Sequence, residues 1–287
     1  MGVPETEWAD RACRRRACRP KMRSQSCGGR SARLPVNTTR EGRLQVPSRH
    51  ATQSQIEVII PVHNEGRVIL GRMAEIRETF AFVGLSSAFL LVENGSTDDT
   101  WSLAQGLERQ GAARVLRSPV ADYGAALRLG IREARSPVLA LAEIDFCDAE
   151  FVEQGATLLD AQADVVQSSK ACRGAVDDRP FTRRVITWGF NLWLRLAFGF
   201  DGTDTHGMKV ARREVLVALV DECRLDGNLL ATEIIVRAQR QGLRVLELPV
   251  SIRETRRPTI GVVDRVPSTL RDMSALARAL KGSGSRS

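Results

Sequence analysis

Short apolar runs alternate with longer periodic stretches along most of the chain after residue 55. The short runs are rich in Val, Ile and Leu and predict β-strands, whereas apolar residues that recur every three or four positions predict amphipathic helices. The predicted strands are residues 56–62, 88–92, 113–116, 138–142, 164–168 and 244–250. The predicted helices are residues 66–82, a helix that starts near Thr97, and residues 123–134, 151–161, 183–200, 229–241 and 268–280. This alternation is typical of an α/β fold, with a mostly parallel central sheet covered by helices on both faces.

The predicted strand at 138–142 leads into two acids, Glu143 and Asp145, with Ile144 between them. Its five apolar residues indicate a strand that is buried on both faces. Residues two apart in a strand point to the same side, so we expect both carboxylates to face one space at the carboxyl end of a central strand. Open α/β sheets bind ligands at that end, and two carboxylates suit Mg²⁺ or Mn²⁺. The alternative is a pair of solvated acids without a ligand.

Two other strand ends carry turn residues and polar groups. Pro61 lies near the end of the first strand, which favours an edge or an exit from the sheet. After the second strand, Gly95 suits a turn with positive φ, and Ser96 or Thr97 suits the cap of the next helix. The sequence therefore predicts three strand-to-helix turns at one edge of the sheet.

The predicted helix at 183–200 is more aromatic than a one-sided surface helix requires, and it includes Trp188 and Trp193. Two interpretations stay open: the helix lies on a membrane surface or lines a lipid site, or it is buried under the sheet.

The positive charge belongs to the N-terminal segment. The chain has 287 residues and a net charge of +8. Residues 1–50 hold 12 basic and 4 acidic residues, and the remaining 30 basic and 30 acidic residues balance. We expect residues 1–54 to be disordered. Contact with nucleic acid or anionic lipid is the alternative, but no aromatic residues are interleaved for stacking on bases, so no nucleic-acid partner is expected.

Composition also bears on location. No run of 18 apolar residues is present, and the N-terminus lacks the apolar core of a secretory signal. The six cysteines follow neither a zinc pattern nor a disulfide framework. We therefore expect a cytoplasmic protein, with the cytoplasmic face of the membrane as a peripheral location.

Four stretches together resemble the GT-A glycosyltransferases of family 2, in particular the branch of dolichyl-phosphate mannose synthases and other polyprenyl-phosphate glycosyltransferases. Residues 59–65 (IIPVHNE) look like the opening strand "VIIPxxNE", and residues 92–100 (VENGSTDDT) look like "VDDGSTDxT". Glu143-Ile144-Asp145 stands where the family has D-x-D. Residues 207–213, Thr232-Glu233 and residues 247–250 (ELPV) look like its acceptor-side motifs. The resemblance covers about residues 56–257.

The resemblance implies a GT-A domain at 55–257, after the basic segment 1–54 and before a helical tail at 258–287. It implies a nucleotide-diphospho-sugar donor and a Mg²⁺ or Mn²⁺ ion held by Glu143 and Asp145. The residues implied in donor binding are Pro61, Val62, Asn64, Glu65, Glu93, Gly95, Ser96, Glu143, Ile144, Asp145, Arg256 and Arg257. The two arginines stand where the family has a mobile basic segment over the phosphates; the alternative is a solvated basic run.

The family reaction is a single displacement with inversion at the anomeric carbon. A hydroxyl acceptor requires a general base, for which Glu233 and Asp204 are candidates beside Asp145 as the catalytic metal ligand; for Glu233 a structural role as a hydrogen-bond acceptor is the favoured alternative. A lipid phosphate is already an anion and requires no base. The residues expected at the acceptor are Arg183, Arg184, Trp188, Trp193, His206 and Lys209.

The sequence departs from the family pattern at Glu143 and Glu93, which replace aspartates, and at Asp122-Tyr123-Gly124, where many relatives have a Lys/Gly pair. Our leading hypothesis is an inverting glycosyltransferase that uses a polyprenyl phosphate as acceptor. The alternatives are transfer to a soluble or protein-bound hydroxyl, and a non-catalytic nucleotide-sugar-binding protein. The sequence specifies neither the donor's base and sugar nor the oligomeric state.

Overall fold

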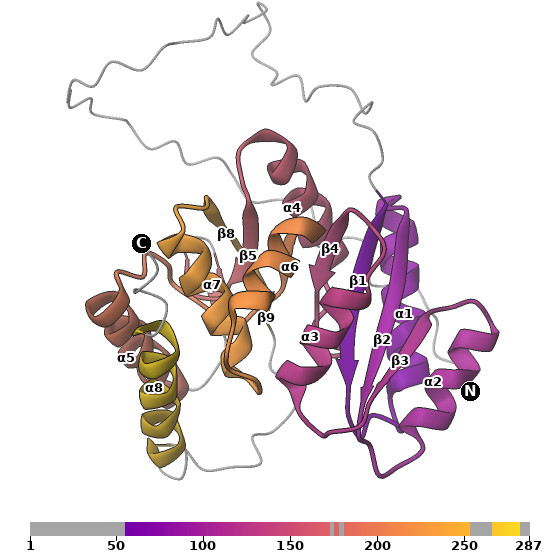
Figure 1. Ribbon diagram of the computed structural model, residues 1–287. Helices are drawn as coiled ribbons and strands as arrows, with labels where there is room; N and C mark the ends of the chain where they lie inside the picture. Colours follow the sequence, from indigo (N-terminus) through magenta and orange to yellow (C-terminus); the bar gives the residue numbers. More distant parts are fainter. Residues whose placement is uncertain (1–54, 173–174, 178–180, 253–265, 282–287) are drawn as a thin grey trace, which may run out of the picture. The chain divides into compact units, whose positions relative to one another are not determined.

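The computed structural model describes residues 55–172, 175–177, 181–252 and 266–281. Within them, seven strands form one sheet in the order β3-β2-β1-β4-β7-β5-β8 (Figure 1). These strands are β1 (Ile56–Val62), β2 (Ser87–Asn94), β3 (Arg114–Ser118), β4 (Val138–Leu141), β5 (Val165–Ser169), β7 (Lys209–Arg212) and β8 (Val245–Pro249). Two short strands, β6 (Val176–Asp177) and β9 (Ser251–Ile252), pair separately.

The central strand is β4, and all four of its residues are buried. It runs parallel to β1, with Val58 opposite Ala140. The predicted central, doubly buried strand is therefore confirmed, although it ends one residue earlier, at Leu141. Pro61 lies in β1 beyond the last residue paired with β4, so its missing N–H leaves no gap in that ladder.

One strand departs from the parallel arrangement. β7 is inserted antiparallel between β4 and β5. Neither β7 nor the following helix α6 (Arg213–Glu222) is among the predicted elements. A strand of four residues with a lysine and an arginine lacks an apolar run, whereas Leu216, Leu219 and Val220 of α6 are spaced as in a helix, a signal that the prediction missed. Since β4 and β5 are both antiparallel to β7, they run in the same direction, and their carboxyl ends lie at the same edge.

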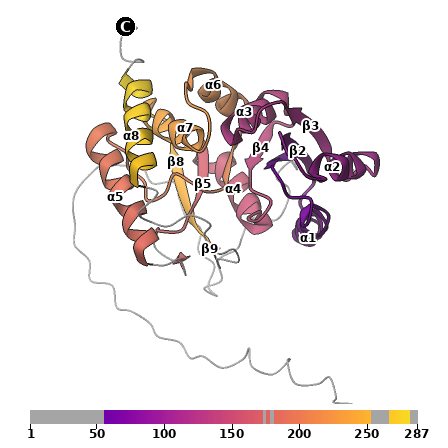
Figure 2. The same cartoon turned by 90° about the horizontal axis from the view of Figure 1, so that it is seen from below.

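Helices cover both faces of the sheet, as predicted (Figure 2). On one face, α1 (Ile69–Val83), α2 (Thr100–Arg109) and α4 (Ala149–Ala161) enclose a core with Ile60 of β1. On the other face, α3 (Tyr123–Glu133), α6 and α7 (Leu229–Arg240) enclose a second core with Ile59. Adjacent strand residues thus enter opposite cores, as the pleat requires.

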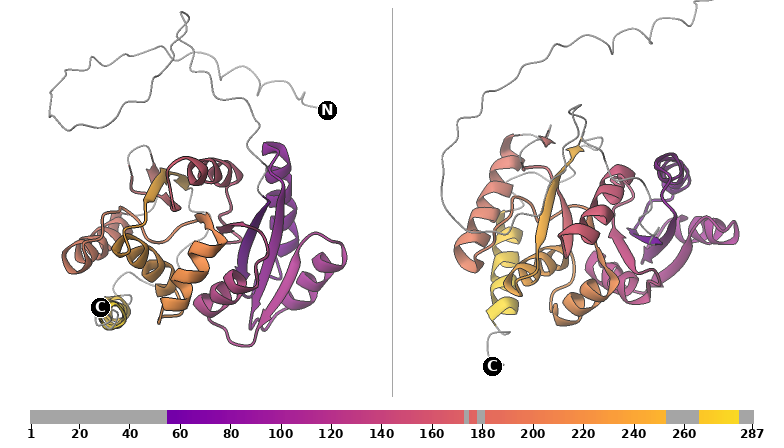
Figure 3. Two further views of the ribbon diagram at one scale, coloured as in Figure 1. Left: turned by 45° about the horizontal axis from the view of Figure 1, so that its top comes forward. Right: turned by 90° about the horizontal axis from the view of Figure 1, so that it is seen from above.

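Two more helices complete the second core. Leu276 and Leu280 of α8 (Val266–Lys281) are buried in it, and the guanidinium of Arg240 donates to the Leu280 carbonyl at 2.9 Å. The helix α5 (Phe181–Phe198) lies beside α8 (Figure 3). No helix in the described part of the chain combines the length and the apolarity needed to cross a membrane.

Candidate active site

The turns that follow β1 and β2 are joined by hydrogen bonds. Asn64 has a left-handed backbone (φ 54°). Its N–H donates to Ser96 Oγ at 3.0 Å, and its Oδ1 accepts from the Thr97 N–H at 2.8 Å. The Gly66 N–H donates to Asp98 Oδ2 at 3.0 Å, while Oδ1 of the same carboxylate accepts from the Thr100 N–H at the start of α2.

These contacts correct the predicted helix cap. Ser96 and Thr97 do not cap α2; Asp98 accepts from its first residue instead. The predicted positive φ of Gly95 is observed at 63°, and a Cβ there would lie 3.0 Å from the Ala121 nitrogen. The two motif turns therefore form one rigid unit, and Asn64, Gly95 and Ser96 build it.

A cavity of about 390 Å³ opens at this edge of the sheet. Its lining residues come from the ends of β1, β2 and β4 and the starts of α3 and α7: Pro61, Val62, His63, Glu65, Asn94, Ala121, Tyr123, Glu143, Ile144, Asp145 and Asn228. Six of them were expected at the donor. His63 and Asn94 lie inside the two quoted motifs, and Tyr123 lies at a position where the chain departs from the family. No sequence signal indicates Asn228.

Glu143 and Asp145 both face this cavity, but not because they extend a strand. Residues 143–146 form a tight turn in which the Phe146 N–H donates to the Glu143 carbonyl at 3.0 Å. Both acids are exposed, and the Ile144 side chain is buried between them. Both acids thus line one cavity, as expected, and the turn at residues 143–146 is what places them there.

The acid pair suits a hard divalent cation whose remaining ligands are supplied by a bound substrate and by water. Among the residues with described positions, no group of three or more His, Cys, Asp or Glu is placed to bind a metal ion. Mg²⁺ commonly takes one or two carboxylates and completes its shell with water and substrate phosphates. The nearby Cys147 supplies no thiolate, because burial raises the pKa of its thiol to about 12.

Glu93 is buried and does not line the cavity. Its carboxylate accepts from the Ser96 N–H and pairs with the Arg117 guanidinium at 3.2 Å. In this structure Glu93 supports the turn around Ser96 and does not face a nucleotide directly.

Lys209 connects the acid pair to the 201–207 loop. Its side chain is fully buried, and its ammonium donates to the carbonyls of Thr205 and Gly207 at 3.1 and 3.0 Å. Burial lowers the pKa of Lys209 to about 8, although the negative charges of Asp204 and Glu143 act to raise it. The ammonium is thus enclosed, which corrects the expectation that Lys209 grips an acceptor phosphate.

The two expected base candidates are held inside the protein. Asp204 is buried, and its Oδ1 accepts from the His206 N–H at 2.9 Å. Glu233 is also buried and accepts from the Leu225 N–H at 2.9 Å and from the Arg237 guanidinium at 2.6 Å. The structure therefore favours the structural alternative for Glu233: its carboxylate anchors the loop before α7.

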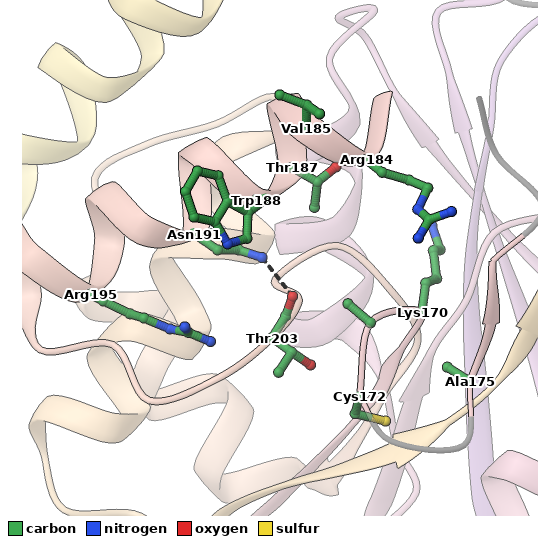
Figure 4. A pocket seen from close by; sticks show the side chains of 11 residues that line it. Lys170, Cys172, Ala175, Arg184, Val185, Thr187, Trp188, Asn191, Arg195 and Thr203 are labelled. Atoms are coloured by element: carbon green, nitrogen blue, oxygen red, sulfur yellow. Dashed lines mark hydrogen bonds between the residues drawn. The ribbon is translucent and has the colours of Figure 1, made fainter. Parts of the chain in front are cut away.

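A second pocket, of about 540 Å³, lies between α5 and the carboxyl end of β5 (Figure 4). Three of its lining residues are cationic: Lys170, Arg184 and Arg195. Trp188 lies at its rim, and the Asn191 amide donates to the Thr203 carbonyl across its floor. Arg184 and Trp188 were expected at the acceptor, whereas Lys170 and Arg195 were not.

The remaining acceptor candidates lie elsewhere. Trp193 is half-buried and packs against the second core, edge-on to Phe198 at 5.2 Å between centroids, so its ring serves packing and does not line the pocket. His206 is exposed and contacts the Phe190 ring. The side chain of Arg183 lies outside the described part, as do Arg256, Arg257 and the segment 1–54.

Comparisons with known proteins agree with this arrangement. The model of the family described as glycosyl transferase family 2 matches residues 57–219. An uncharacterised glycosyltransferase of Mycobacterium bovis is 32% identical over 217 residues, which span 75% of this chain and 91% of the relative. An undecaprenyl-phosphate mannosyltransferase of Micrococcus luteus is 27% identical over 212 residues, which span 70% and 84%.

Among solved structures, glucosyl-3-phosphoglycerate synthase from Mycobacterium tuberculosis, in complex with Mn²⁺, uridine diphosphate and glucosyl-3-phosphoglycerate, shares the fold. Its TM-score is 0.58 at 20% identity, and the match covers 78% of each chain. The family model covers more than half of the present chain, and the mycobacterial relative matches along nearly its whole length. This protein therefore belongs to glycosyl transferase family 2 and is a glycosyltransferase with the GT-A fold.

Proposed function

We propose that the chain moves a sugar from a nucleotide-diphospho-sugar to a phosphate-bearing acceptor, and that this acceptor is a polyprenyl phosphate at the membrane surface. One observation carries the proposal. The cavity with Glu143 and Asp145 and the pocket with Lys170 and Arg184 follow the carboxyl ends of β4 and β5, at one edge of the sheet. An acidic site that suits a metal–diphosphate and a cationic site that suits a phosphate thus lie at the same edge.

The donor would occupy the first cavity. Pro61 and Glu65 frame its nucleotide side, and Glu143 and Asp145 would hold the Mg²⁺ or Mn²⁺ ion. The ion supplies Lewis-acid neutralisation of the departing diphosphate. Mn²⁺ and uridine diphosphate occur together in the structural neighbour, which supports this choice of cofactor and donor class.

The acceptor phosphate would lie in the second pocket, near the guanidinium of Arg184 and the ammonium of Lys170. An oxygen of that phosphate forms the new bond to the anomeric carbon as the bond from this carbon to the nucleoside diphosphate breaks. Because the attacking oxygen is already anionic, no general base is required. Glu233 and Asp204 are buried, and neither lines the donor cavity. Neither is therefore placed to act as a general base there, which favours a phosphate acceptor over a hydroxyl acceptor.

The lipid form of the acceptor is supported by the outer face of α5. Four large apolar side chains are exposed along it: Val185, Trp188, Leu192 and Leu196. Arg184 and Arg195 lie on the same helix, and cations beside an apolar stripe suit an anionic membrane surface. A polyprenyl phosphate is also the substrate named for the Micrococcus luteus relative. Peripheral location at a membrane is part of the proposal.

The donor assignment is tested by a thermal-shift screen of UDP-, GDP- and dTDP-sugars with and without Mn²⁺. We expect one donor to stabilise the wild type only with Mn²⁺, and we expect Asp145→Asn to lose that Mn²⁺-dependent part. Asp160→Asn, an exposed acid on α4, is the matched control and should behave as wild type. Unchanged Mn²⁺-dependent binding in Asp145→Asn would contradict the assigned role.

The acceptor is tested with the donor that binds. Products are analysed with a short polyprenyl phosphate, with 3-phosphoglycerate and with a free alcohol. Transfer to the polyprenyl phosphate that falls at least tenfold in Arg184→Ala supports the lipid assignment. Transfer to 3-phosphoglycerate alone would show a soluble phosphate acceptor. Donor binding without transfer to any of the three would point to a nucleotide-sugar-binding protein.

A further inference from the structure

Asn228 is the residue through which the C-terminal half of the chain reaches the donor cavity. Ten of the eleven lining residues precede residue 146, and Asn228 is the other. It also stands at the N-cap position of α7, where an asparagine side chain normally accepts from the first helical turn. Here the Asn228 backbone is already helical (φ −69°, ψ −16°), and no such side-chain bond forms. The amide is therefore not used as a cap and can face a ligand in the cavity.

The turn before Asn228 is tied to the donor side of the sheet through Asp122. The Asp122 Oδ1 accepts from the Gly227 N–H at 2.9 Å and from the Ala125 N–H at 2.7 Å. The Asp122 N–H in turn donates to Asn94 Oδ1 at 2.7 Å. The Asp122 carboxylate and the Asn94 amide thus hold together the end of β2, the start of α3 and the turn at Gly227.

Close backbone packing and a second anchor fix the same turn. A Cβ on Gly124 would lie 2.4 Å from the Gly227 nitrogen, and Gly227 has a positive φ of 60°. Arg128 donates to the Leu225 carbonyl at 2.9 Å and pairs with Asp226 at 3.1 Å. An exposed loop held by this many contacts places its last residue, Asn228, at a defined point of the cavity.

We infer that Asn228 is a specificity-determining residue whose amide hydrogen-bonds hydroxyl groups of the donor's sugar, and that Asp122 is its positioning residue. An amide offers one acceptor oxygen and two N–H donors, which suits neighbouring hydroxyls on a sugar ring. The acids at 143 and 145 supply acceptors only, so they suit the metal ion, whereas Asn228 brings neutral donors to the same cavity. This inference rests on the proposed placement of the donor.

The test compares a nucleoside diphosphate with the corresponding nucleotide-sugar. Calorimetric titrations with Mn²⁺ use UDP against UDP-glucose, and GDP against GDP-mannose. We expect Asn228→Ala to weaken the nucleotide-sugar about tenfold, the size of one lost hydrogen bond, and to leave the bare diphosphate within twofold of wild type. Gln110→Ala, which truncates an exposed amide at the far end of α2, is the matched control and should change neither.

A second variant, at Asp122, tests whether this residue acts by positioning Asn228 and not by contacting the sugar itself. Asp122→Ala should weaken the nucleotide-sugar selectively, and the double variant with Asn228→Ala should be no worse than the poorer single variant, because both act through one contact. Equal losses for diphosphate and nucleotide-sugar in Asn228→Ala, or no loss at all, would overturn the inference while the donor site stands. Failure of the wild type to bind any donor of the UDP-, GDP- and dTDP-sugar screen would overturn the proposed function and this inference with it.

Discussion

Lys209 shows how a single side chain links the two proposed sites. Its ammonium is enclosed by the carbonyls of Thr205 and Gly207 and lies within the field of Glu143 and Asp204. A buried ammonium normally costs stability unless hydrogen bonds and opposite charges offset its lost hydration. Here both kinds of compensation are present, so Lys209 fastens the 201–207 loop behind the acid pair.

This burial predicts a pH dependence of stability. The pKa of Lys209 is lowered to about 8 in the folded protein from 10.5. Between these values the unfolded chain binds more protons, so the free energy of unfolding rises with pH. Between pH 8 and 10, wild type should gain about 2 kcal/mol relative to Lys209→Met, which has no ammonium to bury. Denaturant unfolding of both proteins at each pH measures this difference, and a constant difference would contradict it.

At the scale of elements, α5 has two apolar faces with different partners. Leu194 is fully buried and Trp193 packs against the second core, whereas Trp188 and Leu196 are exposed. The buried interpretation of the aromatic helix therefore holds for one face, and the membrane interpretation remains a proposal for the exposed face. The sequence shows that the helix has more large apolar residues than one buried face requires, but only packing shows which of them the core takes.

The two tryptophans of α5 form a matched pair for testing this division. Trp188→Ala should change the free energy of unfolding by less than about 0.5 kcal/mol and weaken binding to vesicles with anionic lipid about tenfold, because it removes exposed apolar area. Trp193→Ala should cost about 2 kcal/mol, because its half-buried ring packs against the core. Denaturant melts and vesicle co-sedimentation measure both effects. Equal vesicle binding by wild type and Trp188→Ala would remove α5 as a membrane contact.

At the scale of the whole chain, the described body contains a complete set of sheet and core contacts from Ile56 onward. Among the residues with described positions, β1 pairs with β2 and β4 and contributes side chains to both cores. The domain boundaries at 54 and 257 remain predictions, and α8 packs on α7 as part of the second core.

Removal of residues 1–54 should therefore leave the fold intact. We expect the melting temperature to change by less than about 3 °C, since a change of 1 kcal/mol shifts it by roughly 2–4 °C in a chain of this size. Mn²⁺-dependent donor binding should also be retained. Differential scanning fluorimetry of the truncated and full chains measures both, and a large fall in melting temperature would show that the segment packs on the body.

The sequence by itself was sufficient for most of the elements, with β7 and α6 among the exceptions, and for the edge of the sheet where the acid pair lies. A short apolar run such as 138–141 favours a buried strand, and Glu143, Asp145 and residues 63–65 come soon after strands, so local order places them. The family motifs at residues 59–65, 92–100 and 143–145 implied the donor class and the GT-A fold for the same reason, since each is a contiguous segment that spans a strand end or the turn after it.

Tertiary structure decided everything that depends on contacts between distant segments. It inserted β7 antiparallel beside β4, buried Lys209 and Glu233, packed Trp193 against the second core, and brought Asn228 to a cavity otherwise built from the first 145 residues. None of these follows from periodicity, because a charged side chain buried by partners far away in the sequence has the same local pattern as a solvated one.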